Sequence, residues 1–261
     1  MRRRWLIGRG CWVFVIVAAG LTGAEHARSR EAQPGSAPRP PPRPASLQKP
    51  VSAPPATSPV EKPIVVTQDS ACMRMLAGVA GNRIRPAPSG AKPEPEGCRV
   101  DDPVVVEALA VRTADGPGQV RLLPPPTVSC ELARAVSLWL DTSLQPLARG
   151  AFGRELTALH VGGGHECRRR NRQAQGQLSE HATGKALDIF SFQLGEEKQG
   201  GVAVSVEQPK GLEQSRFLDG VRQSACGAFM TVLGPGSDAA HANHLHVDIQ
   251  QRRAASSRFC Q

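Results

Sequence analysis

The chain has 261 residues and 40% of them are hydrophobic, so it has enough apolar side chains for a packed core and is not disordered as a whole. Its formal net charge is +9, and four arginines of this excess stand in the first nine residues. The remainder is mildly basic, which is typical of a solvated surface and also suits an anionic polymer such as a cell wall. Nothing in the sequence indicates nucleic-acid binding, a phosphate loop or an organic cofactor.

The N-terminal stretch has the three parts of a secretory signal peptide. Arginines at its start are followed by an apolar run from Cys11 to Ala19 and by small residues that end at Ala24. This run is shorter than the roughly 20 residues that span a bilayer, which favours cleavage near Ala24 over a permanent anchor. We therefore expect residues 1–24 to be removed and the mature chain to act in the periplasm or cell envelope, without a stable membrane span.

Residues 25–66 are dominated by proline, alanine and serine. Proline holds φ near polyproline II values and removes backbone donors, so this segment is predicted to be an extended, disordered linker. One folded domain is expected to follow at residues 67–261, and we expect it to be a monomer.

Seven cysteines stand in the chain, one of them in the predicted signal peptide. An even number in the exported part indicates disulfides formed in an oxidising compartment. Their wide spacings do not resemble a zinc ribbon, and spacing alone does not determine how they pair. Pairing of neighbours along the chain is the simplest hypothesis, and it gives Cys72–Cys98, Cys130–Cys167 and Cys226–Cys260.

Apolar runs bounded by glycine, proline or aspartate predict the strands of the domain. In chain order these are residues 102–111, 118–126, 155–161, 186–194, 200–208, 230–234 and 244–250. Apolar residues at helical spacing predict a helix after the cap Ser129, with a kink or an end at Pro146. Its expected buried face consists of Leu132, Val136, Trp139, Leu140 and Leu144.

A second helix is predicted between residues 211 and 229. Its expected apolar face consists of Leu212, Phe217, Leu218 and Val221. The mixture of elements predicts an α+β fold in which helices flank a central, partly antiparallel sheet.

The C-terminal segment HANHLHVDIQ, residues 241–250, holds three of the seven histidines. Successive side chains of a strand point to opposite faces, so His244, His246 and Asp248 would share one face while the apolar residues between them face the core. Two adjacent imidazoles on such a face indicate a metal site or a catalytic pair.

A second polar cluster stands in SEHATGKALDIF, residues 179–190. Gly184 can take unusual φ values, so the chain can turn back and bring His181 beside Asp188. Two histidines and one aspartate could then close on a single ion. Three protein ligands with a free fourth position are typical of catalytic zinc, whereas structural zinc is mostly held by four ligands, chiefly cysteines.

The pattern S-x-H-x-x-G-x-A-x-D at Ser179–Asp188, followed by a late H-x-H, resembles the zinc peptidases grouped as lysostaphin, D-Ala-D-Ala metallopeptidases and the hedgehog signalling domain. The spacing His241-x-x-His244-x-His246 is most similar to that of the penicillin-insensitive murein endopeptidases. The stretch from about Cys72 to Cys260, with its proline-rich leader, also resembles the bacterial extensin-like C-terminal domain family. That name reflects proline-rich composition and not chemistry.

The peptidase resemblance implies that His181, Asp188 and His246 hold Zn²⁺ and that His244 and His241 are catalytic. It implies an exported metallopeptidase of the murein endopeptidase or D,D-carboxypeptidase type. Such an enzyme hydrolyses the peptide stems of peptidoglycan with a zinc-bound water as nucleophile, assisted by a histidine.

One position departs from the peptidase pattern. Many D-Ala-D-Ala peptidases carry a glutamate general base three residues before the last histidine, and this chain has Asn243 there. An amide cannot accept the proton, so the base would be a histidine or Asp248, with Glu166 and Glu180 in reserve. The departure leaves a second hypothesis open, a non-catalytic zinc-containing module that binds the cell wall or has a structural role.

The segment ECRRRN, residues 166–171, stands roughly where the D-Ala-D-Ala peptidases carry an arginine that binds the substrate carboxylate. A guanidinium forms a bidentate pair with a carboxylate, so Arg168 is the candidate substrate-binding residue. The alternative is a charged loop beside Cys167 with no role in binding.

Overall fold

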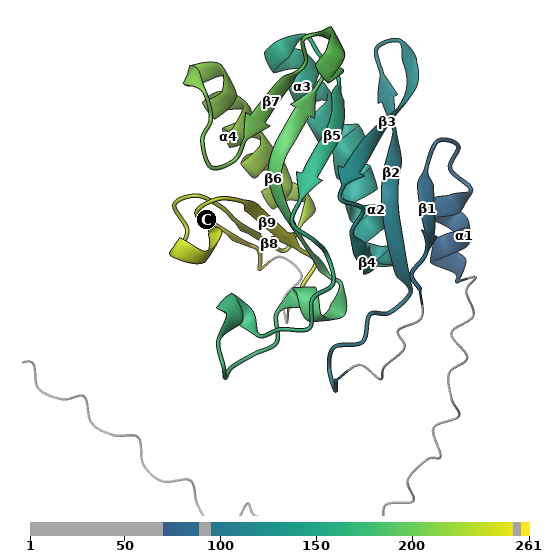
Figure 1. Cartoon of the computed structure of the whole chain (residues 1–261), viewed down its shortest axis with the longest axis vertical. Helices are drawn as coiled ribbons and strands as arrows, with labels where there is room; N and C mark the ends of the chain where they lie inside the picture. Colours follow the sequence, from purple (N-terminus) through teal and green to yellow (C-terminus); the bar gives the residue numbers. More distant parts are fainter. Residues whose placement is uncertain (1–69, 89–94, 253–256) are drawn as a thin grey trace, which may run out of the picture. The chain divides into compact units, whose positions relative to one another are not determined.

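The computed structural model describes residues 70–88, 95–252 and 257–261 (Figure 1). The predicted signal peptide at residues 1–24, the predicted linker at 25–66 and the predicted start of the domain at residue 67 lie outside the described residues. Within the described ranges, none of the helices combines the length and the apolar character needed to cross a bilayer.

The described residues form an α+β fold with a mixed sheet, as predicted. The helices are α1 (Ala71–Ala77), α2 (Cys130–Trp139), α3 (Gln145–Phe152) and α4 (Gly211–Ala228). The strands are β1 (Arg83–Pro86), β2 (Pro103–Thr113), β3 (Gly116–Leu123), β4 (Thr127–Ser129), β5 (Leu156–Val161), β6 (Ala186–Leu194), β7 (Val202–Ser205), β8 (Thr231–Leu233), β9 (Leu245–Asp248) and β10 (Phe259–Cys260). The sequence did not predict α1, β1, β4 and β10, which are short elements with little periodic pattern.

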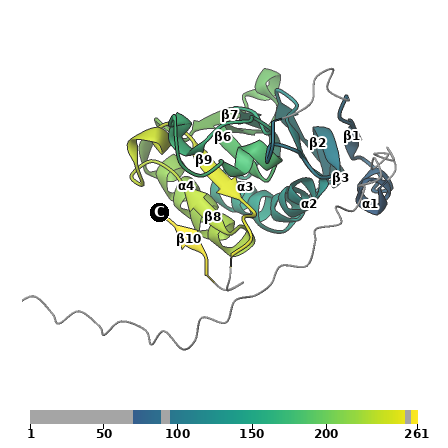
Figure 2. The same cartoon turned by 90° about the horizontal axis from the view of Figure 1, so that it is seen from below.

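The strands join in the order β1-β2-β3-β5-β6-β9-β8-β10, with β4 beside β2 and β7 beside β6. The pairs β3–β5 and β8–β10 are parallel, and the other neighbours are antiparallel. The helices α2, α3 and α4 lie together on one side of the sheet (Figure 2), where they contact β2, β5 and β8. Apolar side chains of the central strands face these helices, so the alternate positions of β6 and β9 point to the opposite face.

The first long helix begins where the sequence predicts it. The Ser129 hydroxyl accepts a hydrogen bond from the backbone N–H of Leu132 at 3.2 Å, and all five residues of the predicted face are buried. The helix does not end at Pro146. Residues Leu140–Leu144 form a π-helical turn and α3 continues from Gln145. Proline has no N–H to donate and is tolerated in the first turn of the new segment.

The predicted apolar face of α4 is partly wrong. Phe217 and Val221 are buried, but Leu212 is 64% exposed. The buried stripe continues through Gln214 and Ala225 instead. Leu212 stands in the first turn of α4, away from this stripe, so it gains little from packing against the sheet.

Strand β6 changes partners in its middle. Residues Ala186–Ile189 pair with β9, and Ser191–Leu194 pair with β7. Against β5, Ile189 and Ser191 pair with consecutive residues, so Phe190 is an extra residue in the ladder. Such a bulge bends the strand and redirects its side chains. The bulge stands two residues after Asp188.

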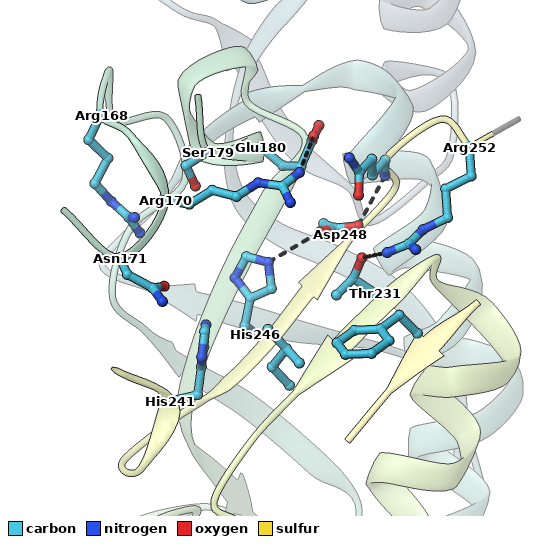
Figure 3. A pocket seen from close by; sticks show the side chains of 13 residues that line it. Arg168, Arg170, Asn171, Ser179, Glu180, Thr231, His241, His246, Asp248 and Arg252 are labelled. Atoms are coloured by element: carbon cyan, nitrogen blue, oxygen red, sulfur yellow. Dashed lines mark hydrogen bonds and ion pairs between the residues drawn. The ribbon is translucent and has the colours of Figure 1, made fainter. Parts of the chain in front are cut away.

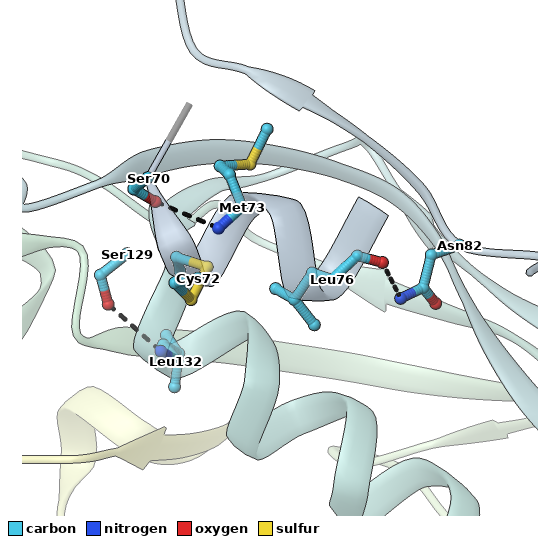
Figure 4. Close-up of a disulfide and its surroundings, with 8 residues drawn as sticks. Ser70, Cys72, Met73, Leu76, Asn82, Ser129 and Leu132 are labelled. Atoms are coloured by element: carbon cyan, nitrogen blue, oxygen red, sulfur yellow. Dashed lines mark hydrogen bonds between the residues drawn. A yellow bond between two sulfur atoms is a disulfide. The ribbon is translucent and has the colours of Figure 1, made fainter. Parts of the chain in front are cut away.

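Two of the three predicted disulfides are wrong. The structure has Cys72–Cys130 and Cys98–Cys167, and it agrees with the prediction only at Cys226–Cys260. Helix α1 packs against α2, which brings Cys72 to the first residue of α2 (Figure 4). Pairing by order fails because the tertiary fold, and not the order of the cysteines, decides which ones meet. Three disulfides indicate an oxidising, exported environment.

Candidate metal centre

His181 is held in a short, tightly closed turn. The 3₁₀ turn Glu180–Thr183 is capped by Ser179, whose hydroxyl accepts a hydrogen bond from the His181 N–H at 3.4 Å. Gly184 ends the turn at φ +65°, and a Cβ at this position would lie 2.9 Å from the Ser129 backbone nitrogen. The turn therefore requires glycine at position 184. The His181 side chain is buried.

Asp188 and His246 face each other across neighbouring strands. They form a registered pair between β6 and β9. Their neighbours Leu187 and Val247 belong to the hydrophobic core, so strand alternation directs Asp188 and His246 to the other face. The cluster at residues 179–190 and the one at 241–250 thus meet through strand pairing.

The three side chains converge on one point. His181 Nε2 lies 3.2 Å from Asp188 Oδ1, His246 Nδ1 lies 2.8 Å from the same oxygen, and the two nitrogens are 3.3 Å apart. Ligands of a tetrahedral zinc ion stand about 2.0–2.1 Å from the metal, which places them roughly 3.3 Å from one another. Among the described residues, these are the side chains whose geometry could hold a metal ion.

The outer nitrogens of both imidazoles have hydrogen-bond acceptors. The carbonyl oxygen of Gly164 lies 2.7 Å from His181 Nδ1, and Asp248 Oδ2 lies 3.3 Å from His246 Nε2. Each acceptor favours a proton on the nitrogen that it faces, so in the neutral rings the lone pairs of His181 Nε2 and His246 Nδ1 point at Asp188. Two lone pairs and a carboxylate oxygen repel one another unless protons or a metal ion stand between them. The donor set therefore fits a cation.

Without an ion, protons take this place. Burial opposes charge on Asp188, but hydrogen bonds from His181 and His246 outweigh it and hold the pKa of Asp188 well below its ordinary value. Burial also acts against a charge on His246, yet the carboxylates of Asp188 and Asp248 raise its pKa to about 9. The centre is thus strongly suited to positive charge.

His244 borders the three side chains. Its Nε2 lies 3.5 Å from Asp188 Oδ1, and its Nδ1 donates to the side-chain oxygen of Asn243 at 2.8 Å. The ring lies against Phe190, with 5.2 Å between centroids. Burial is the largest of the effects that lower the pKa of His244. His244 is therefore a neutral imidazole whose Nε2 faces the centre.

His241 lies beside His244, in the 3₁₀ turn Ala239–His241. Asp238 caps this turn, and its Oδ1 accepts from the His241 backbone N–H at 3.1 Å and from the ring Nδ1 at 2.7 Å. The His241 ring contacts the rings of both His244 and His246, at centroid distances of 5.2 and 5.5 Å. Both predicted catalytic histidines thus adjoin the candidate ligands.

Arg168 reaches the centre from the loop between β5 and β6. Its Nε donates to Glu166 Oε2 at 2.8 Å, and its Nη2 lies 4.0 Å from Asp188 Oδ2. Burial tends to raise the pKa of Glu166, but hydrogen bonds from Arg172 and Arg168 bring it below its ordinary value. Glu166 is thus an ion-paired carboxylate and a weak proton acceptor.

A cleft with two lobes surrounds the three candidate ligands. The larger lobe, of about 630 Å³, is bordered by His181, Asp188 and His244. The smaller lobe, of about 130 Å³, is bordered by His246 and Asp248 (Figure 3). Arg168 and His241 line both lobes, as does Asn171. The cleft therefore gives access to the centre from two sides.

Glu180 lies in the smaller lobe and not among the candidate ligands. Its carboxylate is 3.7 Å from Arg170 Nη2 (Figure 3). Burial, followed by the charge of Asp248, raises the pKa of Glu180. The lobe also contains Arg252, whose Nη2 donates to Thr231 Oγ1 at 2.9 Å.

Sequence reasoning missed two residues of this centre. Gly164 contributes a backbone carbonyl, which no side-chain pattern reveals. Asp238 stands three residues before His241, and this spacing is the signal of an N-cap that could have identified it. Gly164 accepts a hydrogen bond from His181 Nδ1, and Asp238 accepts one from His241 Nδ1.

Residues 70–261 match the family model described as Extensin-like protein C-terminus. No curated protein and no solved structure matches the chain. The family match covers more than half of the chain and includes every described residue of the candidate centre.

Proposed function

The chain belongs to the extensin-like C-terminal family, and we propose that its folded part is an exported zinc metallopeptidase that cleaves peptide cross-links of peptidoglycan. The observation that carries the proposal is the convergence of His181 Nε2, Asp188 Oδ1 and His246 Nδ1 to within 3.3 Å of one another. Two further histidines border this point, and a cleft opens onto it.

The donor set supports zinc over the hard cations. Calcium and magnesium take oxygen ligands, whereas two imidazoles and one carboxylate suit zinc. All six cysteines in the described residues form disulfides, so none is a free thiolate ligand. Three ligands leave a coordination position for water or substrate, which supports a catalytic ion over a structural one.

A bound zinc ion would supply a polarised substrate carbonyl and a water that ionises near neutral pH. The chain's own residues would transfer the protons and bind the substrate. His244 and His241 lie beside the centre, and in this proposal a histidine takes a proton from the attacking water and passes it to the leaving amine. Arg168 borders both lobes and would pair with a carboxylate of the substrate.

The substrate class has two supports. The motifs at residues 179–188 and 241–246 resemble those of murein endopeptidases. The larger lobe, of about 630 Å³, borders His181 and Asp188, so part of a peptide substrate has room beside the candidate ligands. The exported character indicated by the disulfides agrees with a substrate in the cell envelope.

Incubation of the oxidised, zinc-loaded chain with purified sacculi tests the proposal. We expect new uncrosslinked muropeptides from the native protein and a loss of at least about 100-fold in the rate for His244→Ala and His241→Ala combined. His160→Ala is the matched control, because His160 is an exposed histidine on β5. Zinc-loaded native chain that releases no muropeptides from any sacculus would contradict hydrolysis.

A second candidate is a cell-wall binding module that keeps the metal site without turnover. Asn243 favours it, because it occupies the place of the glutamate base and binds His244 instead. The ion pairing of Glu166 also removes one alternative base. Retention on sacculi that depends on zinc, with no products released, would support this function over the first.

A further inference from the structure

The two histidines beside the candidate ligands are each bound by a neighbouring side chain. Asp238 accepts from His241 Nδ1 at 2.7 Å, and Asn243 accepts from His244 Nδ1 at 2.8 Å. An oxygen acceptor on Nδ1 places the proton there, so Nε2 of each neutral ring carries the lone pair. Both rings line the larger lobe of the cleft.

The two partners differ in charge and in how firmly they are held. The Asp238 carboxylate is ionised, and the same oxygen also accepts the His241 backbone N–H at 3.1 Å. These two hydrogen bonds to one residue fix the carboxylate relative to the ring. Both partners are exposed, but Asn243 is neutral and makes one hydrogen bond to its histidine, at the ring of His244.

We propose that Asp238 is a positioning residue that holds His241 in the tautomer whose Nε2 carries the lone pair, with its ring oriented toward the cleft. The catalytic part of this assignment rests on the proposed function. In the proposed hydrolysis of the peptide bond, water attacks the carbonyl carbon and gives a proton to His241 Nε2. The carbon–nitrogen bond then breaks, and the proton passes to the amine that leaves.

The geometry also separates the roles of the two histidines. Asp238 holds His241 at both its backbone N–H and its ring Nδ1, whereas Asn243 holds His244 at the ring Nδ1. His244 lies against Phe190, whose ring fits because position 162 is glycine: a Cβ there would lie 2.3 Å from Phe190 Cε2. His244 thus forms part of the wall of the lobe, and His241 is the histidine that a neighbouring side chain holds at two points.

Ring-nitrogen NMR of the zinc-loaded full chain tests the positioning directly. We expect His241 in the native protein to be protonated at Nδ1, and Asp238→Ala to shift it to the Nε2-protonated form that free imidazole side chains prefer. Asp238→Asn keeps an oxygen acceptor, so it should keep the tautomer. Asp115→Ala and Asp115→Asn are the matched controls, because Asp115 lies exposed in the turn between β2 and β3.

Muropeptide release tests whether this orientation serves hydrolysis. Asp238→Ala is expected to lose about ten- to hundred-fold in kcat and Asp238→Asn to restore most of it, with KM changed by less than about twofold and zinc content unchanged. A His241 tautomer that is the same in Asp238→Ala and the native chain would overturn the positioning, even if the native chain releases no product. Full kcat in Asp238→Ala, or loss of zinc from it, would overturn the role of Asp238 in hydrolysis.

Discussion

Gly164 affects the candidate metal centre without being a ligand. Its carbonyl accepts the His181 Nδ1 proton, and a Cβ at this position would lie 2.2 Å from the Thr127 carbonyl oxygen. Gly164→Ala must therefore displace the segment that orients His181. We expect about 1–3 kcal/mol of lost stability and ten- to hundred-fold weaker zinc binding, measured by denaturation and metal titration.

Gly150→Ala is the matched control for this change. Gly150 lies in α3, and a Cβ there meets no atom within 4 Å. Alanine is favoured over glycine inside a helix, so stability should rise by up to about 1 kcal/mol. Zinc affinity of Gly164→Ala equal to that of Gly150→Ala would show that the carbonyl contact does not orient His181.

The charge on His246 predicts opposite pH dependences with and without metal. Burial disfavours the charge, but Asp188 and Asp248 raise the pKa of His246 to about 9 in the folded state, from 6.5. A raised pKa adds stability that is complete below the unfolded value and is lost as the pH rises through the folded value. The metal-free chain should thus lose stability between about pH 6.5 and pH 9, as thermal unfolding would show.

Zinc reverses this dependence because it competes with protons for the ligand nitrogens. Zinc affinity should rise over the same pH range, and calorimetry in buffers of different ionisation enthalpy should detect proton release on binding. Equal zinc affinity at pH 6 and pH 8 would exclude His246 as a ligand.

The side chains of the centre could be found from sequence because their residue types carry the chemistry. His181, Asp188 and His246 stand in two short motifs, and strand alternation indicates which of them share a face. The contacts of the outer nitrogens could not be predicted in the same way. The Gly164 carbonyl depends on how the loop after β5 folds, and every residue offers a carbonyl.

At the scale of elements, long segments with a periodic apolar pattern were predictable from the sequence. The strands and cysteines that pair with one another were not. The strands β2, β5, β6 and β9 have apolar patterns that local sequence reveals. The switch of β6 from β9 to β7 at Phe190 depends on which strands arrive beside it, which no local pattern contains. The predicted disulfide pairing was wrong for the same reason, since Cys72 meets Cys130 only after α1 packs on α2.

The disulfide Cys98–Cys167 fixes the loop that carries Arg168 and Gly164. It joins residues 69 positions apart, and His165 contacts the Cys98 carbonyl oxygen at 3.0 Å. Replacement of both cysteines by serine should cost about 2–5 kcal/mol and weaken zinc binding. The measurements are denaturation and metal titration of the double variant.

The disulfide Cys226–Cys260 provides the comparison. It joins α4 to the C-terminal strand β10 and makes no covalent link to the loop of Gly164. Its removal should also lower stability, but zinc affinity should stay near that of the native chain at temperatures where both remain folded. Equal effects of the two double variants on zinc affinity would contradict a specific role of Cys98–Cys167.

At the scale of the whole molecule, the predicted export still needs a direct test. Cleavage near Ala24 and the linker at residues 25–66 lie outside the described residues and stay predictions. N-terminal sequencing of the protein recovered from the envelope should find a chain that begins close to Glu25. A chain that retains its first residues would instead indicate an anchor.

The metal content of the purified, oxidised chain tests the central claim most directly. Elemental analysis of the native chain, of His246→Ala and of the control His160→Ala would be made after equilibration with zinc and removal of the excess. We predict one zinc per chain in the native protein and the control, and none in His246→Ala. Native chain without zinc, or His246→Ala with undiminished zinc, would contradict a metal centre at His181, Asp188 and His246.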